Sequence, residues 1–599
     1  MKLRIRFLLL TLFLIFTFCF SIDVLDADNP KSFMDMIPRD SLAYISLSDM
    51  DVVYHSVKEL PEWQELLGIE GIAEDLEKAN QAIQFVPMLL GITVEEFLDA
   101  FGHKMAVSIM KMKGAIPIVG LVADIRSNRE KAEYAAEQAA TIPAVVGGAM
   151  IEEKEYRDVP YTSIATKSLE IKYGFLDDFM IAGLGGGFEK LVDFYKDGGK
   201  SIKDSPNFQF METKVSPIGN IYVYADLERL SPILEQLKKA DSEKKKAETK
   251  EAKDDFGSEI TDTVLKSARS FALSLSLSGK TNEVYLHLDQ EKSNPIVDLI
   301  LAPQTPMSSV NLVPFADGML IGIHVGDPVE LLDKGLKLAE SSGKKKADFE
   351  NGIKQVEDAL GIDLRKDLLS AITGEFAVMA TLPEGQIETE NKMKMYMQMA
   401  QTRQVILIGV RDEDRLAKTA EKLLSLAKMK TMPYSETLYK GTKIHTKVLP
   451  LDTLVPGLAI MPAYAFRNGL FIMGGSEKWI QETIDQIESP VSNDIKGKLS
   501  ESRVLLYLDA GGIADFAGKA IKKGVYKGTN ISDEMQNKLS GLGSVVANIS
   551  WGSDGVGMKL ISSSEDNWAT KILRGVLITI YSKTAGTEEM LPEVSKNEE

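Results

Sequence analysis

The chain has almost no cysteine. Cys19 is the only one among 599 residues, so no internal disulfide can form. Structural zinc sites that use several cysteine thiolates are excluded as well. Stability must therefore come from the burial of apolar side chains, for which a chain of this length is ample.

Histidine is scarce too, and the five histidines lie far apart in the sequence. They are His55, His103, His287, His324 and His445. No His-Glu-x-x-His segment occurs and no two histidines are four residues apart, so the usual zinc-binding spacings are missing. His287 and His324 fall in segments that read as strands, and we expect both to be solvent-exposed strand residues. The sequence predicts no metal site and no cofactor.

Long apolar segments are missing everywhere except at the N-terminus. Lys2, Arg4 and Arg6 precede an apolar run from Phe7 to Phe20 that only threonine interrupts. As a helix, this run is about 21 Å long, shorter than the hydrocarbon core of about 30 Å, which favours a cleaved signal peptide over a membrane anchor. We predict a signal peptide over residues 1–21 and export to the bacterial periplasm or the cell exterior.

A lipid anchor on Cys19 is the alternative to cleavage after Ser21. A lipoprotein signal needs a small residue before the acylated cysteine, and Phe18 occupies that position. We therefore expect no lipid anchor, and contact with the membrane only through the transient signal peptide.

Positive charge is in deficit. The chain has 69 basic and 87 acidic residues, a formal net charge of −18. Such a surplus of negative charge argues against a protein that grips nucleic acid or an anionic membrane surface. Hydrophobic residues make up 44% and charged residues 26%, as in ordinary folded proteins.

The second half of the chain repeats features of the first half in the same order. The matching segments are Gly91–Gly102 with Gly361–Gly374, Met105–Met110 with Phe376–Ala380, Ile116–Val122 with Val405–Val410, Tyr156–Asp158 with Tyr439–Gly441, Tyr173–Ile181 with Tyr464–Ile472, and Tyr222–Asp226 with Leu505–Asp509. The offset between partners stays between 270 and 291 residues. Chance similarity does not keep such an order, so the sequence predicts a tandem duplication.

Each repeat ends in a predicted hairpin. Apolar residues occupy every second position in Leu273–Leu277 and Val284–Leu288 of the first repeat. They do so again in Ala547–Trp551 and Val556–Leu560 of the second, around a turn at Asp554 and Gly555. A period of two is typical of an antiparallel sheet with one buried face. Because helical segments are inserted between the strands, we predict an α+β fold with helices packed on one face of a mostly antiparallel sheet.

Pro303 and Pro306 mark the boundary between the repeats, because proline ends regular structure. We predict an α+β unit 1 over residues 22–302, an α+β unit 2 over 303–585 and an acidic tail over 586–599. Two segments read as additions to the units. They are a charged flexible loop over about 238–256 and an insertion in unit 2 over about 383–403.

The most suggestive motif is the glycine-rich segment Gly183–Lys190, which follows an apolar strand and precedes a helix. Backbone N–H groups at such a place could cradle a phosphate. However, Phe188 occupies the position of the third glycine of a dinucleotide-binding motif, and neither Ser nor Thr follows Lys190 as a P-loop requires. We predict a turn that leads into a helix.

Patterns for a catalytic nucleophile are weak. No G-x-S-x-G segment occurs. Two Ser-x-x-Lys pairs, Ser341 with Lys344 and Ser425 with Lys428, lack the further elements that accompany this motif in known enzymes. The sequence assigns no catalytic residue.

Four methionines alternate within the insertion of unit 2. They are Met393, Met395, Met397 and Met399. Thioethers bind soft Cu(I), but methionine also fills irregular gaps in cores. We favour packing over a soft-metal site.

The opening segment Ile37–Leu47 resembles the start of a family of exported bacterial proteins of unknown function, in which a Pro-x-Asp-Ser/Thr element leads into the first strand. The turns after Tyr156 and Tyr439 and the Gly-Ile-Asp segment at Gly361 also recur there. Unit 2 departs from this pattern at Val313–Gly318, which has one extra residue. The resemblance implies export and a tandem α+β fold, and supplies no substrate, cofactor or active residue.

Three functions remain compatible with these features. The first is non-catalytic binding of a protein partner or ligand in the cell envelope. The second is a carrier of an apolar ligand such as a lipid, and the third is a hydrolase with an unrecognised site. The absence of catalytic motifs favours the first.

Overall fold

A computed structural model gives the fold. It describes residues 33–60, 63, 100–101, 104–113, 116–126, 129–147, 149–166, 169–233, 266–277, 279–289, 291, 307–312, 318–341, 346–382, 403–426, 434–447, 462–488, 502–513, 515–516, 537, 541–552, 554–562, 568 and 571. The chain forms two compact units, residues 1–288 with 566–577 and residues 289–565 with 578–599. Among the described helices, none is long and apolar enough to cross a membrane.

Unit 1 is built on antiparallel strands. Its strands are β1 (Ala43–Ser48), β2 (Lys104–Lys113), β3 (Ile116–Asp124), β4 (Met150–Tyr156), β5 (Val159–Ala165), β6 (Glu170–Leu176), β7 (Phe179–Leu184), β8 (Ile221–Asp226), β9 (Ala268–Leu275) and β10 (Thr281–Leu288). Its helices are η1 (Phe33–Met36), α2 (Met50–Glu59), α6 (Arg129–Gly147), α7 (Gly187–Asp197), η2 (Ile202–Asp204) and α8 (Pro206–Glu212). The strand order is β4-β5-β6-β7-β3-β2-β1-β8-β9-β10.

Unit 2 is built in the same way. Its strands are β11 (Gly318–His324), β12 (Ile372–Thr381), β13 (Arg403–Val410), β14 (Tyr434–Tyr439), β15 (Thr442–Lys447), β16 (Ala463–Arg467), β17 (Leu470–Gly474), β18 (Val504–Asp509), β19 (Ser544–Gly552) and β20 (Gly555–Ser562). Its helices are η4 (Ser308–Leu312), α12 (Pro328–Ser341), α13 (Lys346–Leu360), the π-helical turn η5 (Leu364–Leu368), η6 (Leu369–Ala371), α15 (Glu413–Leu426) and α16 (Glu477–Glu488). The strand order is β14-β15-β16-β17-β13-β12-β11-β18-β19-β20, again antiparallel throughout.

The two strand orders are the same when β1 is matched with β11, β2 with β12, and so on to β10 with β20. Local contacts agree as well. Asp226 accepts a hydrogen bond from the N–H of Arg229 at 3.1 Å, and Asp509 accepts one from Gly512 at 3.1 Å, each three residues further along the chain. Both units are therefore α+β structures with one topology.

The main core of unit 1 lies between its sheet and helices α7 and α8. Phe208 of α8 is fully buried and packs edge-on against Tyr44, Tyr222 and Tyr224 of the sheet. Aromatic pairs in such an arrangement stabilise more than their buried area alone. In unit 2 the corresponding core packs α16, through Ile480 and Ile484, on the sheet.

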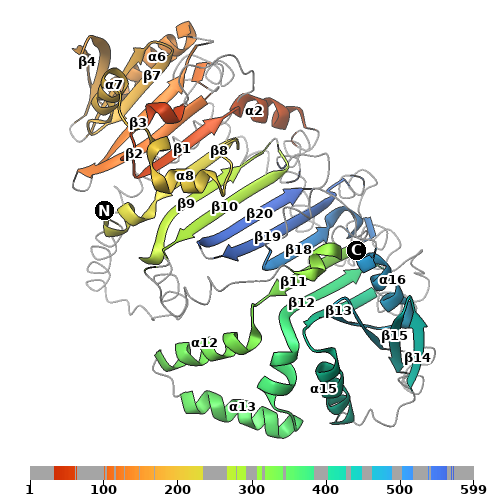
Figure 1. The fold of residues 1–599 in the computed structure, drawn as a ribbon. Helices are drawn as coiled ribbons and strands as arrows, with labels where there is room; N and C mark the ends of the chain where they lie inside the picture. Colours follow the sequence, from red (N-terminus) through yellow and green to blue (C-terminus); the bar gives the residue numbers. More distant parts are fainter. Residues whose placement is uncertain are drawn as a thin grey trace, which may run out of the picture. The chain divides into compact units, whose positions relative to one another are not determined.

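Helices cover both faces of the sheet, so the prediction of helices on one face is wrong. In unit 1, α6 and α7 both lie near β4 and β7 (Figure 1), and they pack on opposite faces of the sheet. Its alanines, Ala132, Ala135, Ala136 and Ala140, let the helix approach closely over a second, smaller core. In unit 2, Leu416 of α15 packs on Phe466 and Phe471 in the same manner. The alternating residues that predicted a solvent-exposed face lie in the terminal hairpins. These hairpins are at the end of each sheet that α6 and α15 do not cover.

Several predicted local structures are confirmed. The glycine-rich segment is the turn between β7 and α7, and the predicted hairpin turns follow Tyr156 and Tyr439. The two terminal hairpins are β9–β10 and β19–β20. The signal peptide, the charged loop, the Pro303–Pro306 boundary, the methionine segment and the acidic tail lie outside the described residues.

Candidate functional site

The outer face of the unit 2 sheet, opposite to α16, carries an exposed apolar row. The row is defined by side chains that are register partners across seven adjacent strands: Leu560, Ala547, Leu506, Ile321, Val378, Ile406 and Met473. The larger members at its centre are unusually open for aliphatic side chains. Ile321 is 45% exposed, Val378 44%, and Leu506 39%. A contiguous apolar patch of this kind marks a binding surface more often than a single exposed leucine does.

A second row runs beside the first on the same face. It consists of Met558, Ile549, Val504, Ile323, Phe376, Ile408 and Phe471. Met558 and Ile323 are exposed, whereas Phe376, Ile408 and Phe471 pack against the small core beneath α15. The open surface is therefore widest over β11, β18, β19 and β20, and narrows to the first row over β13 and β17.

The equivalent row of unit 1 is less exposed. The matching positions in its strands are Val284, Leu273, Val223, Ile45, Val107, Leu121 and Ala182. Leu121 and Ala182 pack in the small cores beneath α6, and Val107 is buried. The other four side chains of the row are half-buried. The open row is thus a property of unit 2 and not of the fold.

Polar side chains take over at one end of the apolar row. Beyond Met473 the register continues through Tyr464 of β16, His445 of β15 and Glu436 of β14. The rings of Tyr464 and His445 are stacked at 4.8 Å, and Nδ1 of His445 lies 3.4 Å from the Glu436 carboxylate. Lys443 lies on the same face, is largely exposed and reaches the same carboxylate at 3.6 Å. The series of register partners therefore changes from apolar side chains, which end at Met473 on β17, to polar and charged ones on β16, β15 and β14.

A buried polar cluster in unit 2 is the second candidate. His324 and Glu375 are register partners on β11 and β12, and the N–H of His324 donates to the carbonyl of Arg503 at 2.7 Å. The exposed fractions of these three residues are 2%, 2% and 1%. The Glu375 carboxylate accepts the N–H groups of Ser308 at 2.9 Å and Ser309 at 2.6 Å.

The electrostatics of this cluster fit a closed structural site. The guanidinium of Arg503 lies 4.9 Å from the ring centre of Trp551, and burial lowers its pKa to about 10. Burial also lowers the pKa of His324. The positive charges of Arg503 and Arg411 lower it further, and the negative charge of Glu375 raises it. Groups this deeply covered are not placed to meet a substrate.

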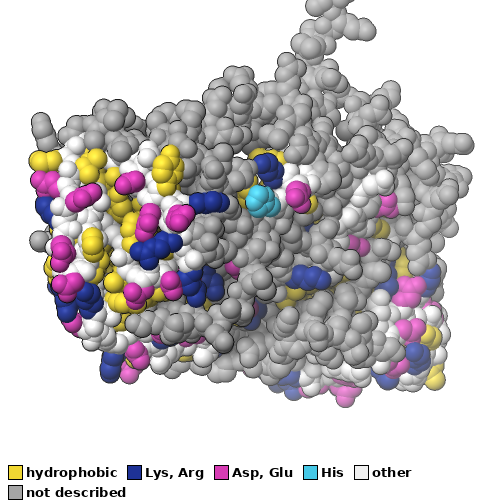
Figure 2. Space-filling model, turned by 90° about the horizontal axis from the view of Figure 1, so that it is seen from above, with side chains coloured by type: hydrophobic (Ala, Val, Ile, Leu, Met, Phe, Trp, Pro, Cys, Tyr) yellow, Lys and Arg dark blue, Asp and Glu magenta, His cyan; other side chains and the backbone are white. Residues whose placement is uncertain are grey.

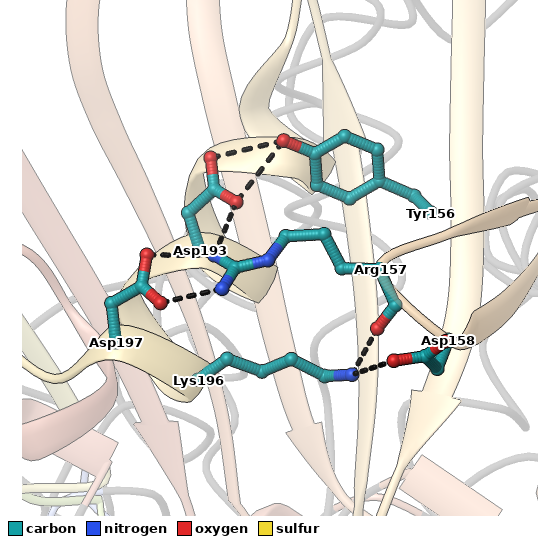
Figure 3. Close-up of polar contacts among 6 residues, drawn as sticks. All are labelled: Tyr156, Arg157, Asp158, Asp193, Lys196 and Asp197. Atoms are coloured by element: carbon teal, nitrogen blue, oxygen red, sulfur yellow. Dashed lines mark hydrogen bonds and ion pairs between the residues drawn. The ribbon is translucent and has the colours of Figure 1, made fainter.

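The third candidate joins a hairpin to a helix and occurs in both units. In unit 1 the hydroxyl of Tyr156 donates to Asp193 of α7 at 3.0 Å, and Arg157 bridges Asp193 at 2.9 Å and Asp197 (Figure 3). Lys196 donates to the carbonyl of Arg157 in the same view. The hydrogen bond to Asp193 raises the pKa of Tyr156, and that from Arg157 lowers the pKa of Asp197.

Unit 2 rebuilds this contact with other residues. Tyr439 donates to Asp485 of α16 at 2.9 Å, and Lys440 lies 2.7 Å from Asp485 and 3.4 Å from Glu488. Lys440 holds the pKa of Asp485 below its usual value. Because these groups are satisfied by one another and exposed to solvent, the contact holds each hairpin on its helix and leaves no group for a ligand.

The histidines are not brought together. His55 is exposed on α2, and His287 stacks on Phe210 at 4.0 Å and contacts Ser270. The expectation that His324 is solvent-exposed is wrong, because it lies at the end of the central strand β11, between Glu375 of β12 and Arg503, and is 2% exposed. Within the described segments, no group of three potential metal ligands occurs. Lys344, Lys428 and His103 lie outside them.

On the face drawn in Figure 2, surface charge does not single out another site. On the described part of the face drawn in Figure 2, acidic side chains lie among basic and hydrophobic ones, with no field of one sign. The apolar row is what sequence reasoning missed. Its signal was the unbroken apolar run of β11, β13 and β18, for example Val405–Ile408 and Val504–Leu508, where alternation would indicate one wet face.

Comparisons with known proteins add little to this geometry. No family model matches the chain, and no curated protein matches it. Among solved structures, crystal form III of TP0453 matches with 10% sequence identity over 46% of this chain and 88% of that chain, at a TM-score of 0.23. A score this low carries no argument, so the candidate site rests on the contacts within this chain.

His324 provides a pH test of the buried cluster. Its Nδ1 accepts a hydrogen bond from the N–H of Gly326 at 3.0 Å, which only the neutral ring can do. Since its folded pKa lies below the unfolded value, the unfolded state binds more protons as pH falls below about 6.5. We expect the free energy of unfolding of unit 2 to fall between pH 7.5 and 5.5.

Hydrogen exchange of peptides from β11 and β12, followed in urea at both pH values, measures this loss. In His324→Asn, whose side-chain oxygen can accept from Gly326 without titrating, the difference between the two pH values should shrink. An equal difference in wild type and variant would show that His324 is not its source.

Proposed function

We propose that this protein is an exported, non-catalytic binding protein of the bacterial cell envelope, and that it binds an apolar partner on the open sheet face of unit 2. One observation carries the proposal. Ile321, Val378 and Leu506 lie in register on adjacent strands and are each more than a third exposed, while their counterparts in unit 1 are buried or half-buried. Moving such a side chain from full exposure to full burial contributes about 1.5–3 kcal/mol. These three are 39–45% exposed, so a partner that covers them gains somewhat less than half of that from each.

A non-catalytic role is supported by where the titratable groups lie. The cluster around His324, whose pKa burial lowers, is closed off and holds its carboxylate on backbone N–H groups. Catalytic groups instead converge in an open pocket. Because the open surface is apolar, the ligand that it supports best is an apolar one, as in the carrier hypothesis.

We further propose that units 1 and 2 arose by tandem duplication. The shared strand order, the Asp226 and Asp509 contacts, and the hairpin–helix contacts at Tyr156 and Tyr439 support this history. The signal peptide predicted over residues 1–21 supports the proposed address in the periplasm or outside the cell.

The proposal is tested on protein purified from its own envelope. Native mass spectrometry of the wild type is expected to show an added apolar molecule. Ile321→Lys, which places a charge at the centre of the row, should lose this mass. Ile218→Lys, the same change at a turn residue of unit 1 that is 86% exposed, should retain it. Wild-type protein without any added mass, or equal retention in both variants, would contradict the proposal.

A further inference from the structure

The dimensions of the open row limit what it can bind. Strands in a sheet lie about 4.8 Å apart, so seven strands span roughly 29 Å. Side chains on one face of a strand repeat every ~6.8 Å, so the two rows together are about 14 Å wide. Multiplied by the length, this gives an apolar surface of at most roughly 400 Å². A stable protein partner buries about 800 Å² on each side. The row is therefore small for a protein and long for a compact ligand.

An extended hydrocarbon chain matches this shape. The hydrocarbon core of a bilayer is about 30 Å thick and two chains deep, so one acyl chain extends about 15 Å, well within the row. From Leu560 to Met473 the row offers aliphatic side chains and one alanine, with no polar atom to pair. A hydrocarbon chain is the ligand that leaves no polar group unsatisfied on such a surface.

The polar end of the same line supplies what the apolar part lacks. Tyr464, His445 and Glu436 continue the register, and Lys443 presents an ammonium group beside them. Lys443 is 69% exposed at its side chain and holds Glu436 only at 3.6 Å, so it can reach a head group without leaving a buried partner. A molecule with a hydrocarbon tail and a polar head would meet matching chemistry along its whole length.

We infer that the apolar row holds the tail of a single-chain amphiphile, with its polar head at the β14–β15 hairpin. This inference rests on the proposed function, since it names the apolar partner. The tail lies across β17, β13, β12 and β11, perpendicular to the strands. The head lies at Tyr464 and His445 and accepts hydrogen bonds from Lys443.

Titration with cis-parinaric acid, a fatty acid that fluoresces in apolar surroundings, tests the tail. The full-length mature protein should bind it saturably. Ile321→Lys should raise the dissociation constant at least about tenfold, and Ile218→Lys should leave it unchanged. Absence of saturable binding, or equal loss in both variants, overturns the inference.

Photo-crosslinking tests the orientation. A fatty acid with a diazirine next to the carboxylate should label peptides within residues 434–447, and one with the diazirine at the methyl end should label β11, β12 or β18. The reverse pattern, or the same pattern with both probes, overturns the placement of the head. If no fatty acid binds while envelope-purified protein still carries an apolar mass that Ile321→Lys removes, the amphiphile is refuted and the binding function stands. If no fatty acid binds and the envelope-purified protein carries no apolar mass, the inference and the proposed function both fail.

Discussion

Glu375→Ala is expected to destabilise unit 2 by about 3–5 kcal/mol, the loss typical of removing one member of a buried charged set. The carboxylate is 2% exposed and accepts two backbone N–H groups, from Ser308 and Ser309. Alanine leaves both donors without this acceptor, and each costs about 1–3 kcal/mol. It also removes the negative charge whose effect opposes the lowering of the His324 pKa.

Urea unfolding of the full-length mature protein, read by hydrogen exchange in peptides of β11 and β12, measures this loss. Glu375→Gln keeps one oxygen acceptor and should fall between wild type and alanine. Glu421→Ala, which removes an exposed carboxylate on α15, should change stability by less than about 0.5 kcal/mol. A loss below about 1 kcal/mol for Glu375→Ala would show that water replaces the carboxylate and that the cluster is open.

Gly187→Ala is expected to cost more than about 3 kcal/mol or to prevent unit 1 from folding, as severe steric conflicts in a core do. Gly187 is the first residue of α7, and a Cβ there would lie 1.8 Å from the carbonyl oxygen of Val119 on β3. The Cβ is fixed to the backbone of α7, and the carbonyl oxygen belongs to the backbone of β3. The conflict is therefore relieved only if the helix shifts away from the sheet. The buried residues Phe188 and Leu191 of α7 would move with it.

The neighbouring glycine provides the control. Gly186 has φ +97°, and no atom lies within 4 Å of the place that a Cβ would take there. Gly186→Ala therefore adds only the backbone strain of a left-handed residue, about 1–2 kcal/mol. Urea midpoints of the two variants, or their soluble yields if Gly187→Ala does not fold, should differ accordingly. Equal behaviour would mean that the turn's conformation, and not its contact with β3, requires glycine.

These two predictions concern different properties of the molecule. The first tests whether the deepest titratable cluster is a structural element, as the non-catalytic proposal requires. The second tests whether the glycine-rich segment serves the fold, which removes it as a phosphate site. Neither changes the apolar row, so binding of an amphiphile can be measured independently in stable variants such as Ile321→Lys.

The amino-acid sequence determined what depends on neighbouring residues in the chain. Period-two alternation in Leu273–Leu277 predicted a strand, and the residues after Tyr156 and Tyr439 predicted hairpin turns, because backbone preferences and side-chain direction act locally. The failed nucleotide-binding pattern at Phe188 identified a helix entry. The ordered series of matching segments indicated two units of one kind.

Only the tertiary structure decided which faces are covered. Ile321 and Leu320 are equally apolar in the sequence, yet one is 45% exposed and the other 0%. The reason is that α16 packs on the inner face, whereas on the outer face the described helix α15 packs beside Ile408 and Phe471 and leaves the centre of the row open. His324 reads as a polar strand residue but is buried, because Glu375 and Arg503 come to it from positions 51 and 179 residues further along the chain. Burial depends on contacts between distant segments, and residue type alone carries no record of them.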